Sequence, residues 1–148
     1  MSTGEPSFWD VVDSIRESDA RYRREAYGFV VAALEAVVRA LPAERRDDPQ
    51  RRHLSGQELL QGVAVLARQE FGFMAAAVFE EWGVRSGEDV GAIVFQLVER
   101  GQLSARPEDS PGDFRGMDLA RALSGDGERG HSQRPDPRRS GGGRRTGD

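Results

Sequence analysis

The sequence predicts an all-α protein with a single small domain of about five helices, an irregular C-terminal strap and a disordered Gly/Arg tail. Apolar residues recur at three- and four-residue intervals along most of the first hundred positions, as they do on one face of an α-helix. Serines and glycines stand where helices favour them at their starts and ends. We therefore expect a helical domain over residues 1–123 and a tail over residues 124–148, where no aliphatic or aromatic residue is available for burial.

Two helices are expected in the first third of the chain. The first covers residues 6–18, with Pro6 and Ser7 at its start and an apolar stripe of Phe8, Val11, Val12 and Ile15. The second covers residues 20–41 and ends before Pro42. Its apolar face repeats at intervals of three and four and consists of Tyr27, Val30, Leu34, Val37 and Leu41.

In the middle of the chain we expect a solvated connection over residues 43–53, followed by a helix over residues 55–71. This helix is expected to pair in a hairpin-like arrangement with the helix over residues 20–41. Ser55 and Glu58 have the spacing of a capping box, and Leu54 precedes them at the position of a hydrophobic staple. Gly72 bends or breaks this helix before a further helical stretch that stops at Gly83.

We expect the helix over residues 89–99, which follows a cap at Ser86, to lie at the centre of the domain. Its apolar residues occupy nearly its whole circumference, and Gln96 is the one polar side chain between positions 90 and 98. A helix that reads DNA needs a polar outer face, and Glu88 and Asp89 would present the wrong charge to phosphates. A winged-helix reading remains the alternative, because a glycine and an acidic turn follow this helix as they would before a wing.

Composition narrows the possible functions. All 21 basic residues are arginine, which suggests codon choice in a GC-rich genome and makes arginine content weak evidence for phosphate binding. Residues 1–123 contain 15 Arg and 21 acidic residues, a balance of −6, whereas the tail contains 6 Arg and 4 acidic residues. An acidic domain repels nucleic acid and anionic membranes at long range. The absence of a signal peptide and of an uninterrupted apolar span predicts a cytoplasmic protein without a membrane partner.

The candidate binding residues are few. Arg51, Arg52 and His53 precede a helix start and could bind an anion, although Ser55 can cap that helix while the basic side chains lie in water. Trp82 could anchor a partner, although a Trp in this position more often seals the edge of a core. The chain has neither Cys nor Lys, and no catalytic, metal or cofactor site is expected. The arginine tail could contact RNA or an acidic partner without sequence specificity.

Several strings in order resemble a family of short bacterial proteins, the Minf-type conserved hypothetical proteins. They are YRREAYGFVVAALE, RHLSGQELLQG, EFGFMAAAVFEEWGVRSGEDVGAIVFQLVERGQLS and EDSPGDF, and they cover roughly residues 8–119. The family has no assigned activity, ligand or catalytic residue, so the resemblance assigns no role to any position. The chain departs from the family pattern after Phe114, where RGMDLARAL replaces an aromatic-rich continuation.

From these observations we expect a non-enzymatic interaction or adaptor protein of unidentified protein partner. The sequence provides a core and well-capped helices but no catalytic constellation. A DNA-associated regulator of the winged-helix type is the alternative. The sequence does not predict the oligomeric state.

Overall fold

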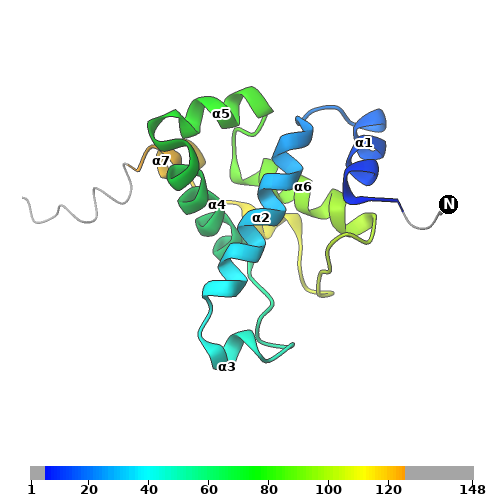
Figure 1. The fold of residues 1–148 in the computed structure, drawn as a ribbon, viewed down its shortest axis with the longest axis vertical. Helices are drawn as coiled ribbons and strands as arrows, with labels where there is room; N and C mark the ends of the chain where they lie inside the picture. Colours follow the sequence, from blue (N-terminus) through cyan, green and yellow to red (C-terminus); the bar gives the residue numbers. More distant parts are fainter. Residues whose placement is uncertain (1–5, 126–148) are drawn as a thin grey trace, which may run out of the picture.

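The computed structural model describes residues 6–125, and these residues form the predicted all-α domain (Figure 1). Five helices have eight or more residues: α1 (Phe8–Ser18), α2 (Arg24–Ala40), α4 (Gly56–Phe71), α5 (Ala75–Trp82) and α6 (Gly87–Glu99). Four shorter elements complete the described part: α3 (Ala43–Arg46), α7 (Leu119–Ser124) and the 3-10 turns η1 (Gly72–Met74) and η2 (Pro111–Phe114). The described residues contain no strand. From residue 126 onward, the predicted tail lies outside the described residues.

Three of the long helices begin at serine capping boxes, which confirms that the sequence marked these helix starts. The hydroxyl oxygens of Ser7, Ser55 and Ser86 accept hydrogen bonds from backbone N–H groups three residues later, at 3.1, 3.0 and 3.3 Å. Gly83 ends α5 in the left-handed conformation with φ +86°, where a glycine costs least. The helix boundaries therefore follow from local backbone chemistry.

Two helical segments differ from the prediction. Helix α2 starts at Arg24 instead of Ala20, because the Asp19 carboxylate accepts hydrogen bonds from the backbone and the guanidinium of Arg21 and so forms a turn. The predicted connection over residues 43–53 contains the four-residue helix α3. This helix forms because the Pro42 carbonyl accepts hydrogen bonds from two backbone N–H groups, at 2.9 and 2.8 Å.

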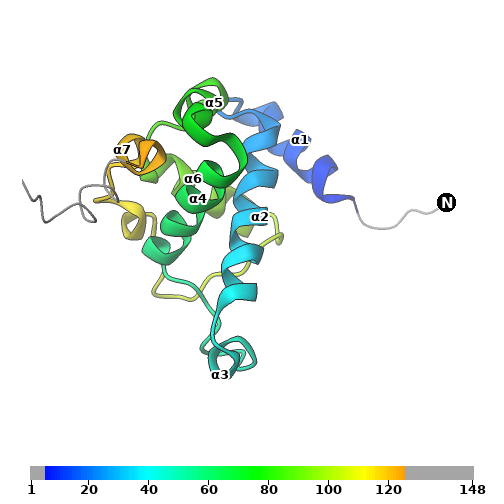
Figure 2. The ribbon, with the colours of Figure 1, turned by 60° about the vertical axis from the view of Figure 1, so that its left-hand side comes forward.

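The core lies where α2, α4 and α6 meet. Helix α4 packs against α2 on one side and α7 on the other, and Figure 2 shows it between them. The approach of α2 to α4 depends on Gly62, since a Cβ there would lie 2.2 Å from Val37 Cγ2. The largest fully buried side chains are Tyr22, Tyr27, Leu60, Ile93, Leu97, Leu119, Val12, Val63 and Val90. The predicted pairing of the helices over residues 20–41 and 55–71 is confirmed.

Helix α6 is a central helix of the domain, as its composition predicts: Val90, Gly91, Ile93 and Leu97 are buried, and the other residues from position 89 to position 98 are partly buried. No residue from position 89 to position 98 is exposed. Its two polar side chains in this stretch face buried tyrosines: the Tyr22 hydroxyl donates to Asp89 Oδ1 at 2.6 Å, and the Tyr27 hydroxyl lies 2.5 Å from Gln96 Oε1. Burial raises the pKa of Tyr27 to about 12 and also raises the pKa of Tyr22, to which the Asp89 hydrogen bond contributes. Both tyrosine hydroxyls are therefore hydrogen-bonded inside the core, each to a side chain of α6.

One stretch of the described residues, Gly56–Trp82, has the length and composition of a membrane span, and an 18-residue window within it has a mean hydropathy of 1.3. It comprises α4, η1 and α5, and its charged residues are Glu58, Arg68, Glu70, Glu80 and Glu81. The backbone bends at Gly72, where φ is +57°. Its inward-facing residues, which include Leu59, Leu60, Val63, Ala64, Ala67, Ala75 and Phe79, belong to the core of the domain.

Candidate functional site

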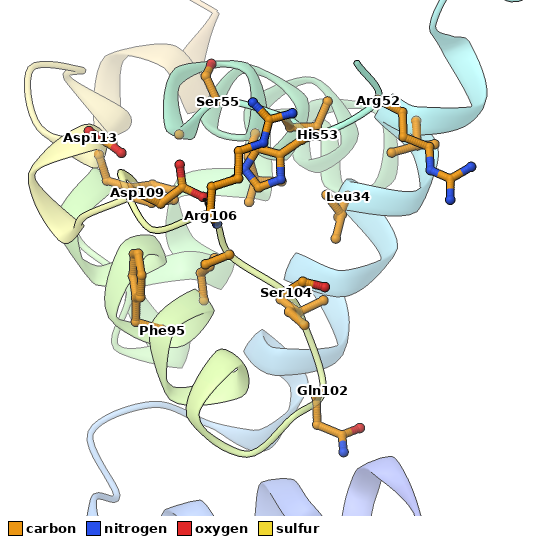
Figure 3. Close-up of a pocket in the computed structure, with 18 of the residues that line it drawn as sticks. Leu34, Arg52, His53, Ser55, Phe95, Gln102, Ser104, Arg106, Asp109 and Asp113 are labelled. Atoms are coloured by element: carbon orange, nitrogen blue, oxygen red, sulfur yellow. Dashed lines mark hydrogen bonds and ion pairs between the residues drawn. The ribbon is translucent and has the colours of Figure 1, made fainter. Parts of the chain in front are cut away.

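A half-open cavity of about 530 Å³ lies between α2, the start of α4, α6 and the segment that follows α6. We call this segment, residues 102–118, the strap, and the cavity the strap pocket (Figure 3). Apolar side chains form its floor: Leu34, Val38, Leu54, Leu59, Val94, Phe95, Leu103 and Phe114. Polar side chains from the loop before α4 and from the strap form its rim. The volume falls within the range typical of ligand sites.

Arg45 holds the loop before α4 in place. Its guanidinium donates to the backbone carbonyls of Arg51 and His53 at 2.5 and 3.1 Å, and it pairs in bidentate fashion with Glu58 at 2.8 and 2.9 Å. One arginine of the short helix α3 therefore links two points of the loop, one of which lines the pocket, to the first turn of α4. The sequence predicted a solvated connection here, but Arg45 gives this connection a defined position.

The same glutamate completes the cap of α4. Glu58 Oε1 accepts the backbone N–H of Ser55 at 2.9 Å, while the Ser55 hydroxyl accepts the N–H of Glu58. The hydrogen bonds from Arg45, with a smaller contribution from Ser55, lower the pKa of Glu58 from 4.5 to about 2. The carboxylate stays charged at neutral pH, where it keeps both its ion pair with Arg45 and its place in the cap of α4.

Two contacts join the strap to the loop before α4. His53 Nε2 lies 2.8 Å from Asp109 Oδ2, and the same carboxylate oxygen accepts the backbone N–H of Arg106 at 2.7 Å. The Arg106 guanidinium donates to the carbonyl oxygen of Gln50. Figure 3 shows the side chains of His53, Arg106 and Asp109 close together. Residues more than fifty positions apart thus form one rim.

The far end of the strap is seated on α4 and α6. The Gln57 amide donates to the backbone carbonyls of Asp113 and Arg115, both at 2.9 Å. The Phe114 ring lies on α6 so closely that a Cβ at Gly91 would be 2.9 Å from it. A Cβ at Gly56 would lie 2.8 Å from the Asp113 carbonyl oxygen. The strap backbone therefore covers the first turn of α4, where the sequence suggested that an anion could bind.

The rim offers more free hydrogen-bond donors than free acceptors. Arg52 forms no ion pair or side-chain hydrogen bond within residues 6–125, and the Arg106 guanidinium bonds only the Gln50 carbonyl. The rim carboxylates are occupied: Asp109 binds His53, and Asp113 Oδ2 accepts the backbone N–H of Ser110 at 3.0 Å. Each guanidinium carries five N–H donors. The pocket therefore combines an apolar floor with donors suited to a carboxylate or carbonyl oxygen.

The structure separates the four residues that the sequence singled out. Arg52 and His53 line the strap pocket, whereas the exposed Arg51 side chain does not. Trp82 lies elsewhere, half-buried in an aromatic cluster with Phe29, Phe71 and Phe79, at ring-centroid distances of 5.4 to 5.8 Å. The loop arginines and Trp82 are therefore parts of different surfaces.

Sequence reasoning missed two members of the rim, Arg106 and Asp109. Their only local signal is the string RPEDSPGDF, which reads as a turn and a capped 3-10 start around Ser110. Nothing in this string indicates contact with His53. Among the described residues, no group of three or more His, Asp or Glu side chains could hold a metal ion.

Comparisons with family models, with curated proteins and with solved structures found no match to this chain. The resemblance to the Minf-type family stays a prediction.

Proposed function

We propose that this protein is a non-enzymatic interaction module, and that it binds a short segment of a protein partner in the strap pocket. The segment would place an apolar side chain on the floor and a carboxylate at the rim. One observation carries the proposal: the floor is apolar, while the guanidinium of Arg52 and most donors of Arg106 have no acceptor among residues 6–125. Such a combination provides both affinity and orientation.

The shape of the pocket favours a peptide segment over an extended polyanion. The two rim arginines are balanced by Asp109 and Asp113, so recognition depends on local hydrogen bonds instead of a broad positive field. The described domain is acidic, which opposes long-range attraction to nucleic acid. A short acidic segment can approach because its single carboxylate meets donors at close range.

The burial of α6 supports an interaction role over DNA reading. No side chain between positions 89 and 98 is exposed, so α6 offers no polar face to a groove. The acidic residues of its first turn are also used internally, since Asp89 caps the helix and accepts from Tyr22. These observations leave the strap pocket as the better surface for recognition.

A peptide-binding experiment tests this function. Short fluorescent peptides that place Phe or Leu beside Glu are titrated with the protein, and binding is followed by fluorescence anisotropy. We expect Arg52→Glu to weaken binding by about tenfold, because a charge-assisted hydrogen bond becomes a repulsion. Arg51→Glu is the matched control, since it changes the net charge equally but lies outside the pocket. Equal loss in both variants, or no binding by the wild type, would refute the proposal.

A further inference from the structure

The connection between α4 and α5 exposes an unusual amount of apolar surface. Phe73 is 96% exposed and Met74 is 49% exposed, and both belong to η1. The string FGFMAAAVF, residues 71–79, contains no polar side chain. We call Phe73 and Met74 the knob. A phenylalanine this exposed gains from burial in a partner, because aromatic rings contribute much of the contact area at interfaces.

An acidic residue stands beside the knob. Glu70 lies in the last turn of α4, three residues before Phe73, and its side chain is exposed. Glu70 forms no ion pair within the described part of the chain, whereas the two acidic residues in the last turn of α5 do: Glu81 pairs with Arg23 at 2.7 Å and Glu80 lies 3.8 Å from Arg85. The knob therefore presents an apolar side chain with one uncommitted carboxylate next to it.

These features match what the strap pocket lacks. Within the part of the chain that the structure describes, the pocket has an apolar floor and arginine donors without acceptors, and the knob has an exposed ring and a carboxylate without donors. We infer that the knob of one copy of this chain occupies the strap pocket of a second copy, with Glu70 directed to Arg52 or Arg106. This inference rests on the proposed function and names a second copy as the partner.

The two surfaces cannot meet within one copy. The pocket is lined at the first residue of α4 and the knob follows its last residue, so a helix of 16 residues, about 24 Å long, separates them. Figure 1 shows η1, between α4 and α5, at the opposite end of α4 from the loop that precedes it. The contact is therefore head-to-tail, and it leaves one free knob and one free pocket at the ends of every open assembly.

The association is expected to be weak. A contact made by two side chains and a pocket rim is small beside the roughly 1,600 Å² of a standard stable interface. The acidic domains also repel one another at long range. We expect monomers at low micromolar concentration and growing assemblies at higher concentration.

Sedimentation velocity of the full chain over a concentration series provides the first test. Phe73→Ser is expected to weaken self-association at least roughly tenfold, since burial of a Phe side chain contributes more than the free energy of a tenfold change. Val65→Ser is the matched control, because Val65 is also an exposed apolar residue of this region, at 39%, but lies outside the knob. Wild-type protein that stays monomeric throughout, or equal effects of both variants, would overturn the inference.

A charge exchange tests the pairing itself. Glu70→Arg and Arg52→Glu are each expected to weaken self-association several-fold, and the double variant is expected to recover it. A photo-reactive phenylalanine analogue at position 73 should crosslink to strap or loop residues of another copy. Crosslinks to any other surface, or a double variant weaker than both single variants, would contradict the inference. If acidic apolar peptides bind the pocket while the chain stays monomeric, the proposed function stands and this inference fails.

Discussion

The close packing of the strap on α6 can be tested by adding one methyl group to α6 through the substitution Gly91→Ala. In Gly91→Ala, the new Cβ would lie 2.9 Å from two ring atoms of Phe114 and 3.1 Å from its Cβ. Phe114 is 5% exposed, and its neighbours are held by the Gln57 amide, so the ring has little room to move. Overpacking of this kind costs about 1–3 kcal/mol. Alanine in place of glycine in a helix recovers up to about 1 kcal/mol.

The control is Gly28→Ala, which has the same gain in helix propensity. A Cβ at Gly28 would lie 2.6 Å from the far end of the Trp9 ring, and Trp9 is 39% exposed and can swing outward. The free energy of unfolding is measured for both variants by urea titration. Because the propensity gain cancels, Gly91→Ala should be less stable than Gly28→Ala by about 1–3 kcal/mol. Equal stability of the two variants would refute the claim that the strap is seated tightly on α6.

Three further predictions concern polar contacts. The lowered pKa of Glu58 stabilises the fold fully above about pH 4.5, and this stabilisation is lost as the pH falls toward 2. Glu58→Gln has no ionisable group beside Arg45, so the free energy of unfolding should fall by about 1 kcal/mol less between about pH 6 and pH 3 than in the wild type, allowing for solvent screening. An unchanged dependence of stability on acid pH would contradict this. Tyr22→Phe should lower the free energy of unfolding by about 1.5–3 kcal/mol because the Asp89 carboxylate loses a buried donor, and calorimetry showing no change in Tm would argue against the hydrogen bond. Asp109→Ala should speed amide exchange in the strap while the core helices keep their protection, and uniform exchange rates would show that this carboxylate does not tether the strap.

The sequence predicted the fold class well because local chemistry decides most helix boundaries. Ser7, Ser55 and Ser86 each have an acidic residue three positions later, and each forms the capping box that this spacing indicates. Helix α6 has apolar residues around nearly its whole circumference, and such a helix is stable only when it is enclosed by other elements. Periodicity and caps therefore account for most of the architecture.

The sequence predicted less of the site, because the pocket depends on long-range contacts. It singled out Arg52 and His53, but the partner of His53 lies 56 residues away and has no motif. From the sequence, Arg45 was expected to be one of several solvated arginines, yet its guanidinium connects α3 to the loop and to Glu58. The free donors of Arg52 become visible only when the partners of the other arginines are known.

The most direct test of the strap pocket as the recognition site is to map where a peptide binds. An isotope-labelled sample of the protein is titrated with a peptide that contains Phe beside Glu, and backbone amide shifts are recorded. We expect the largest changes of amide shift in residues 50–56 and 102–114, and almost none in α5 and the Trp82 aromatic cluster. Changes centred on Trp82, or spread evenly over the domain, would contradict the assignment of recognition to the strap pocket.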